Sequence, residues 1–122
     1  MTGMFLTPLR VKLVDEDEGI WELASPLTYR SSVAKQDFYI PVGFQTDFAS
    51  VARVPIAYML FGDTAHAAAT VHDYLYRFQP VSRRVADDVF LEAIEASTGM
   101  GWLQRRLMWA AVRVFGGLYW KG

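Results

Sequence analysis

Two different hydrophobic patterns divide the 122-residue chain at about residue 62, and this division constrains its fold more than any other feature. From residue 3 to about 43 the chain is rich in β-branched and aromatic residues, which favour strands. After residue 62, apolar residues three and four positions apart indicate helices. Strands followed by helices predict an α+β fold, with a small N-terminal antiparallel sheet packed against a C-terminal three-helix unit.

The strand-rich part contains four candidate segments, at residues 4–14, 19–25, 26–33 and 37–44. An acidic turn, "DEDEG", separates the first two. Residues 44–62 are expected to form a loop and a short helix, and residues 63–118 to be mainly helical. Since 52% of the residues are hydrophobic, residues 1–122 can bury one modest core, and we expect a single domain.

Composition excludes several classes of site. The chain has no cysteine, so disulfides, thiolate metal sites and thiol nucleophiles are ruled out. The formal charge of −1 gives no overall attraction to nucleic acid, and none is expected as a partner. The sequence contains no apolar run long enough for a transmembrane segment and shows no signal peptide, so we expect a cytoplasmic protein.

The first two helices are predicted to bring His72 and Asp87 together. The short "QPVS" connection at residues 79–82 makes the helices an antiparallel hairpin, with Ser82 placed to cap the second. His72 shares its helix face with alanines, and Asp87 lies on the apolar face of its own helix. At a rise of about 1.5 Å per residue, both lie roughly 8–9 Å from the turn and should face each other.

A buried carboxylate needs a partner, and an imidazole is a suitable one. The pairing fixes the tautomer of His72 and leaves its second nitrogen free to accept a proton from water. Tyr76, one turn further along, can donate to the same carboxylate of Asp87. Catalysis by these three residues requires a pocket that is open to solvent. The alternative is a satisfied polar network that only holds the two helices in register.

Other acidic residues around this pair have different expected surroundings. Asp73 points about 100° away from His72 around the helix, where it could offer an oxygen ligand at the rim of the site. Asp88 aligns with Glu92 and Glu95 and is expected on the solvated face of the second helix. The neighbouring Arg83 and Arg84 open that helix, and they are expected to pair with Asp87 or Asp88.

The segment "TDFASVAR" supplies further candidates from a loop. Asp47 could join Asp73 at a divalent cation, while Arg53 and Ser50 could bind substrate. Alternatively, Asp47 makes a local turn and Ser50 caps the next helix. A catalytic triad of Ser50 with the His–Asp pair is conceivable from residue types alone, but no nucleophile-elbow motif supports it.

The third helix carries two stripes with the spacing of a single helix face. One alternates aromatic and basic residues, which suits a partner surface, a phosphate-rich surface or a lipid interface. Its members are Trp102, Arg106, Trp109 and Arg113. The other stripe is apolar and consists of Leu103, Leu107, Ala110 and Val114. Alternatively, the tryptophans cover the hydrophobic core.

Several motifs of the chain resemble a known family. "GFQTDFASVAR", "AAATVHDYLYR", "SRRVADDVFLEA" and "WAAVRVFGGLYW", between residues 40 and 120, are similar in order and content to a phage and prophage family known as domain of unknown function 1353. The resemblance implies a bacteriophage or prophage origin near tail and lysis genes, without an activity. The family usually has Val-Pro-Arg where this chain has Val51, Ala52 and Arg53.

The stretch "HDYLY" is also similar to the active-site helix of secreted phospholipases A2. That resemblance implies that His72 activates water and that Asp73 binds calcium. It also implies that Tyr76, with an Asp on the next helix, orients the histidine, a role that Asp87 would take here. The calcium loop and the disulfides of those enzymes have no counterpart in this chain.

Two functions are therefore compatible with the sequence. The first is a phage-encoded hydrolase that acts on an ester or amide bond of the host envelope, with a divalent cation, calcium as the first candidate. The second is a non-catalytic virion, assembly or host-interaction protein, whose partners are phage structural proteins or a component of the host envelope. Either would reside in the cytoplasm of the infected or lysogenic bacterium or in the virion.

Overall fold

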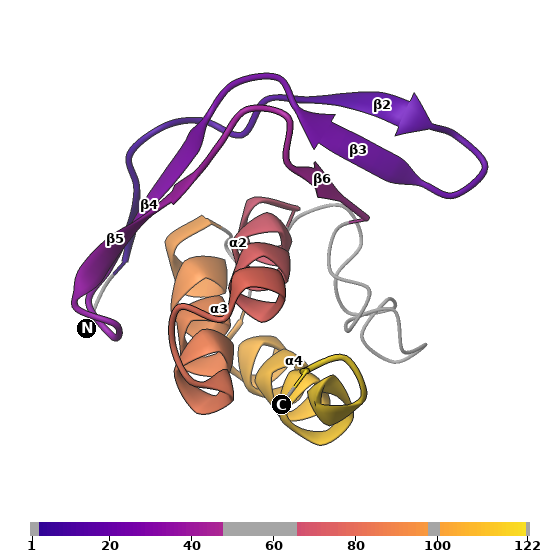
Figure 1. Cartoon of the computed structure of the whole chain (residues 1–122). Coiled ribbons are helices and arrows are strands. Elements are labelled where there is room, and N and C mark those ends of the chain that lie inside the picture. Colours follow the sequence, from indigo (N-terminus) through magenta and orange to yellow (C-terminus); the bar gives the residue numbers. More distant parts are fainter. Residues whose placement is uncertain (1–2, 48–65, 98–100, 122) are drawn as a thin grey trace.

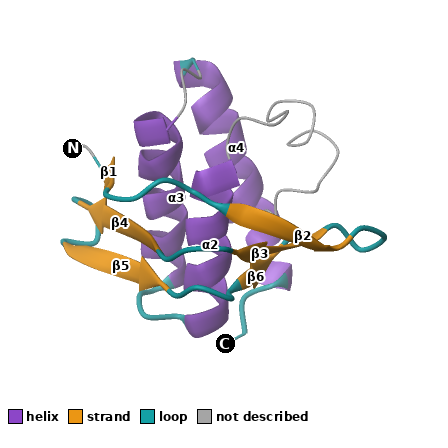
Figure 2. Cartoon of the chain, turned by 90° about the horizontal axis from the view of Figure 1, so that it is seen from above, coloured by secondary structure: helices purple, strands orange, loops and turns teal. Residues whose placement is uncertain are grey.

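A computed structural model describes residues 3–47, 66–97 and 101–121 of the chain. Two small antiparallel sheets from the N-terminal half lie on one side of three helices from the C-terminal half (Figures 1 and 2). This arrangement confirms the α+β prediction. The strands form two three-stranded sheets instead of the one that the sequence suggested.

The first sheet has the strand order β1-β4-β5 and the second the order β2-β3-β6. The strands are β1 (Met4–Phe5), β2 (Val11–Asp15), β3 (Ile20–Leu23), β4 (Leu27–Ser31), β5 (Gln36–Ile40) and β6 (Gln45–Thr46). The predicted strand at residues 4–14 is thus divided between the two sheets. Thr7 ends the first part because its hydroxyl bonds to Pro26 O (3.2 Å) and Thr28 N (2.9 Å), and Pro8 has no N–H for a ladder.

Strands β2 and β3 form a hairpin that projects beyond the helices, as both views show (Figures 1 and 2). Its tip is the predicted acidic turn, in which Asp15 Oδ1 accepts a hydrogen bond from Glu18 N at 3.0 Å. Gly19 closes the turn with φ of 68°, a conformation that glycine adopts without strain. The four acidic residues of the tip are all exposed.

The helices are α2 (His66–Phe78), α3 (Arg83–Ser97) and α4 (Trp102–Phe115), and a short 3₁₀ helix, η2 (Gly116–Leu118), follows. As predicted, Ser82 caps α3, since its hydroxyl accepts a hydrogen bond from Val85 N at 3.2 Å. Helices α2 and α3 pack closely, and α4 packs on α3. In Figure 1, α4 lies on the side of the helices away from the sheets.

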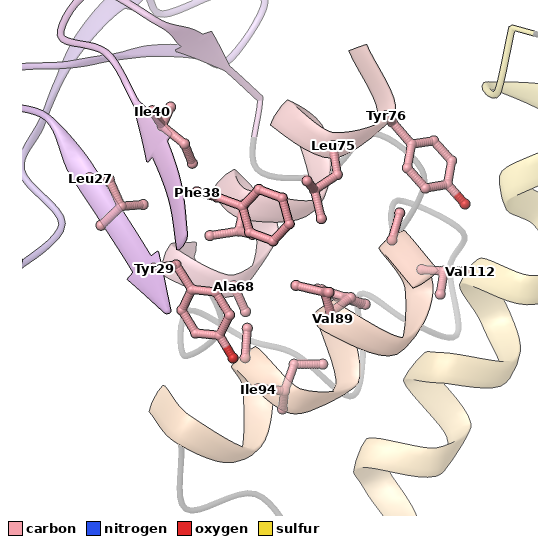
Figure 3. Packing of buried hydrophobic residues seen from close by; sticks show 14 of the residues in the cluster. Leu27, Tyr29, Phe38, Ile40, Ala68, Leu75, Tyr76, Val89, Ile94 and Val112 are labelled. Atoms are coloured by element: carbon pink, nitrogen blue, oxygen red, sulfur yellow. The ribbon is translucent and has the colours of Figure 1, made fainter. Parts of the chain in front are cut away.

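The hydrophobic core fills the space between the first sheet and the helix pair (Figure 3). Leu27 and Tyr29 alternate along β4 toward this core, and both are fully buried. Figure 3 shows Tyr29 directed toward Ile94 of α3, and Tyr76 of α2 directed toward Val112 of α4. The core therefore continues through the helix pair to α4, and the polar cluster around Tyr76 sits at this far end.

Glu92 differs from its predicted place on a solvated face. Its side chain is buried, and its two carboxylate oxygens accept hydrogen bonds from Tyr29 Oη (2.7 Å), Ser32 N (3.0 Å) and Val33 N (3.0 Å). The spacing of Glu92 relative to Asp88 and Glu95 predicted that it would share their solvated face. In the structure, the end of β4 covers α3 at Glu92. Glu92 therefore anchors the first sheet to α3 through a fully paired carboxylate.

Candidate functional site

The predicted contact between the first two helices is present. Nε2 of His72 on α2 lies 2.9 Å from Oδ1 of Asp87 on α3. Tyr76, one turn after His72, donates its hydroxyl hydrogen to the same oxygen at 2.6 Å. The helical hairpin thus brings the three predicted catalytic side chains together. They meet because His72 and Asp87 lie at about the same distance from the turn, as their spacing in the sequence predicted.

The contact with Asp87 determines which nitrogen of His72 carries hydrogen. A carboxylate only accepts hydrogen bonds, so Nε2 donates, and in a neutral ring Nδ1 is then the nitrogen without hydrogen. Nδ1 is buried and has no hydrogen-bond partner among the residues that the structure describes. An unpaired buried acceptor costs about 1–3 kcal/mol, so this atom calls for a physical explanation.

Two aromatic rings lie against the imidazole of His72. The ring centroid of His72 lies 4.2 Å from that of Tyr76 and 4.6 Å from that of Phe90. Burial, together with the hydrogen bond to Asp87, raises the pKa of Tyr76 above its ordinary value, so the phenol remains a donor. Tyr76 therefore holds both the carboxylate and the face of the imidazole.

A cation from the third helix completes the cluster. Arg113 Nη1 donates to Oδ2 of Asp87 at 2.9 Å, while Arg83 Nε lies 4.0 Å from the same oxygen. Arg83 also donates to the Tyr76 hydroxyl at 3.3 Å and to the carbonyl oxygens of Val112 and Arg113. These carbonyls belong to the last turn of α4, where a cation is favourable.

Arg113 was expected on a partner surface, and the structure places it against Asp87 instead. The sequence did contain a signal for this role, because a buried carboxylate with only neutral partners is costly. The expected pairing of the two arginines at the start of α3 is confirmed, with Arg84 Nε 3.4 Å from Asp88.

The site is closed in this structure, whereas catalysis by these residues requires a pocket that is open to solvent. The side chains of His72 and Asp87 have 0% exposed surface, and Tyr76 is 6% exposed as a whole residue. The rings of Tyr76 and Phe90 lie against the imidazole, and Arg113 lies against the carboxylate. Water therefore reaches Nδ1 only in a state more open than this one.

Asp73 is buried as well, whereas the sequence placed it at an exposed rim. Its Oδ2 accepts a hydrogen bond from the hydroxyl of Thr46 on β6 at 2.5 Å. One turn later, Arg77 Nη1 donates to Gln45 O at 2.7 Å and its guanidinium lies 5.0 Å from the Phe44 ring centroid. These side chains attach α2 to the second sheet.

The predicted cation ligands are Asp73 and Asp47, the latter half-buried directly after β6. Within residues 3–47, 66–97 and 101–121, no group of three or more His, Asp or Glu side chains is placed to hold a metal ion. The donor set there does not complete a cation site on its own. The predicted substrate-binding residues Ser50 and Arg53 lie outside the described residues, as does the proposed serine triad.

The other predicted partner-surface residues lie along α4. Trp102 is 64% exposed, with the Arg106 guanidinium 6.0 Å from its ring centroid. Trp109 is half-buried and donates its indole N–H to Asp88 at 2.9 Å. The residues of α4 that face the core are Met108, Ala111 and Val112, so neither predicted stripe covers the core.

None of the helices in the described part of the chain has the length and apolar content to cross a membrane.

Comparison with known proteins assigns the chain to a family. No curated protein and no solved structure matched the chain, so the similarity to phospholipases A2 rests on the "HDYLY" residues alone. A family model described as "Protein of unknown function (DUF1353)" matches residues 21–112, well over half of the sequence. The chain therefore belongs to the DUF1353 family.

Proposed function

We propose that the protein is a hydrolase in which Nδ1 of His72 acts as the general base toward water. The observation that carries this proposal is the unpaired Nδ1 opposite a firmly held Nε2. A side chain needed only to join two helices gains nothing from an unsatisfied buried acceptor. A general base needs one, together with a partner that fixes its ring.

The proposed reaction uses the two ring nitrogens differently. Nδ1 of His72 accepts a proton from water, and the water oxygen forms a bond to the carbonyl carbon of an ester or amide. The bond to the leaving group then breaks, and the leaving group takes the proton from Nδ1. During these steps the ring is transiently an imidazolium, which the carboxylate of Asp87 stabilises through Nε2–H.

Tyr76 and Arg113 act as positioning residues in this proposal. Tyr76 holds one oxygen of Asp87 at 2.6 Å, and Arg113 holds the other at 2.9 Å. With both oxygens engaged, the carboxylate cannot rotate away from the imidazole. Since His72 is closed off here, the reaction requires an opening that admits water and substrate to Nδ1.

A divalent cation at Asp73 and Asp47, with calcium as the first candidate, stays a prediction. The mechanism above does not use it, because the described donors do not complete its site. A cation that binds would raise the melting temperature, and Asp73→Asn would abolish this rise. Ser50 and Arg53 likewise stay predicted substrate-binding residues.

The proposed substrate follows from the resemblance to phage and prophage proteins. A phage-encoded hydrolase made in the cytoplasm of the infected or lysogenic cell, or carried in the virion, meets the host envelope. We therefore propose an ester or amide bond of the envelope as its target.

Turnover of p-nitrophenyl butyrate by purified protein tests the proposal. In His72→Gln the amide can still donate to Asp87 but has no basic nitrogen, so activity should fall by at least about 100-fold with the fold retained. His66→Gln, at the other, half-buried histidine, is the matched control. Absence of turnover by the unaltered protein, or full activity of His72→Gln, would count against catalysis by His72.

Access to the site can be tested separately from turnover. Diethyl pyrocarbonate acylates unprotonated imidazole nitrogens that it can reach. If the site opens, peptide mass spectrometry of the folded protein should find a modified His72 as well as His66. Modification confined to His66 would show that Nδ1 stays closed to reagents of this size.

The second candidate function is non-catalytic, in the virion, in assembly or in contact with the host. It is favoured by the complete burial of His72 and Asp87 and by the 64% exposure of Trp102. Co-purification with a tail or capsid protein that is lost in Trp102→Ala and kept in His72→Gln would support this function. Loss of folding in every His72 variant would support a structural role for the cluster.

A further inference from the structure

We infer that the outer face of α4 is a docking surface for an anionic lipid layer. The outer face is defined here as Leu103, Leu107, Ala110 and Val114, whose spacing of four, three and four residues places them on one side of the helix. Leu103 is 63% exposed and Val114 71%. This inference goes beyond the proposed hydrolysis and does not depend on it.

The outer face is separate from the face that α4 uses for folding. Met108 and Val112 are fully buried and lie on another side of the helix, and the buried Ala111 lies between that side and the outer face. A surface helix normally exposes polar residues opposite its buried stripe. In α4 the exposed side chains that the structure describes are apolar or aromatic, with Arg106 as the exception, so the helix presents an apolar face to solvent.

The aromatic and basic residues around the outer face match a membrane interface. Trp102 at the start of α4 is 64% exposed, and Tyr119 just after η2 is 47% exposed. Rings with a polar edge at both ends of an apolar stripe suit the boundary between headgroups and acyl chains. Leu118, in η2 directly after the helix, is a further large apolar side chain and is 83% exposed.

The positive charge of the C-terminal part of the chain favours an anionic partner for the outer face. Residues 96–122 contain Arg105, Arg106, Arg113 and Lys121 and no acidic residue. Arg106 and Lys121 are exposed, whereas Arg113 is occupied by Asp87. The acidic hairpin tip projects from the opposite, sheet side of the molecule (Figure 1). An anionic layer would therefore attract the α4 side and repel the other, which orients the protein.

The apolar side chains of the outer face, together with its cations, favour a lipid layer as the partner over nucleic acid or a second copy of the chain. Nucleic acid would contact cations and polar groups, and it would leave Leu103 and Val114 in water. A second copy that paired through the same face would place two helices with cations and no carboxylates against each other. An anionic lipid surface suits both the apolar side chains of the outer face and the cations beside it, since its acyl region takes up the former and its headgroups pair with arginine.

Co-sedimentation of the full chain with vesicles tests the inference. We expect binding to vesicles of phosphatidylcholine and phosphatidylglycerol in equal parts, weaker binding to phosphatidylcholine alone, and weaker binding at high salt. Val114→Glu should weaken binding by at least about tenfold, since a charge replaces a lipid-contacting valine. Arg106→Gln should weaken it by about fivefold, the effect of one cation near the surface.

Val14→Glu is the matched control, because Val14 is an exposed valine (44%) on the β2–β3 hairpin. It adds the same charge on the sheet side and should leave vesicle binding unchanged. Equal binding by Val114→Glu and the unaltered protein, or no binding to anionic vesicles, would overturn the inference. Concentration-dependent self-association that Val114→Glu abolishes, without vesicle binding, would also overturn it and assign the face to a second copy.

Discussion

Arg113 of α4 and Asp87 of α3 form an ion pair between these two neighbouring helices, with 2.9 Å between Nη1 and Oδ2. The other oxygen of the same carboxylate binds His72 and Tyr76 of α2. All three helices therefore meet at one buried acidic side chain. This shared carboxylate links the stability of the helical unit to the orientation of the imidazole.

The first prediction concerns Asp87 itself. Asp87→Asn replaces a carboxylate by an amide that cannot accept from all its donors, and it leaves the Arg113 cation without its counter-charge. We expect a loss of about 3 kcal/mol in the free energy of unfolding, measured by urea titration. Asp88→Asn, at a half-buried residue paired with Arg84, should cost about 1 kcal/mol or less. Equal losses at the two positions would contradict the central role of Asp87.

The second prediction concerns the backbone next to Tyr76. A Cβ atom at Gly116 would lie 2.3 Å from the Tyr76 hydroxyl oxygen and 3.2 Å from Arg83 Nη2. Gly116→Ala should therefore displace Tyr76 and cost about 1–3 kcal/mol by urea titration. At Gly117 the nearest atom would be 3.8 Å away, so Gly117→Ala should be close to neutral. A neutral Gly116→Ala would show that Tyr76 has room to move.

The third prediction concerns the anchor between α3 and the first sheet. Glu92→Gln keeps the shape of the side chain but replaces one acceptor oxygen by a donor, which faces either Tyr29 or the amides of Ser32 and Val33. We expect a loss of about 2 kcal/mol and faster hydrogen exchange at those two amides. Glu95→Gln, at an exposed position of the same helix, should change neither quantity. Unchanged exchange in Glu92→Gln would mean that the anchor does not hold the turn.

The fourth prediction concerns alkaline pH. Burial, then hydrogen bonding to Glu92 and Asp87 respectively, raises the pKa of Tyr29 and of Tyr76 from the ordinary value of 10.0. The folded state therefore favours the neutral phenols, and their contribution to stability is complete below pH 10.0 and lost as the pH rises above it. Urea midpoints across this range should fall less steeply in Tyr76→Phe. Tyr39→Phe, at an exposed position, is the control, and an equal slope in all variants would contradict the assignment.

The sequence predicted the elements whose signals are local. Ser82 after a proline marked the start of α3, and the short loop between α2 and α3 placed His72 opposite Asp87. Each of these inferences needed only residues close in the chain and the fixed geometry of a helix.

The sequence was less informative where distant segments meet. The division of residues 4–14 between two sheets depends on pairing with β3 and β4, which no local pattern specifies. The burial of Glu92 arises because β4 covers that side of α3, and Arg113 turns to Asp87 because α4 packs on α3. The closure of the site around His72 is likewise a property of tertiary packing.

The tautomer of His72 is the most direct test of the central claim. Long-range ¹H–¹⁵N NMR spectra of the folded protein distinguish a protonated ring nitrogen from an unprotonated one. If Asp87 fixes the ring and leaves the base free, the spectrum at neutral pH will show hydrogen on Nε2 and an unprotonated Nδ1. A His72 ring that carries its hydrogen on Nδ1 would contradict both the described contact and the proposed chemistry.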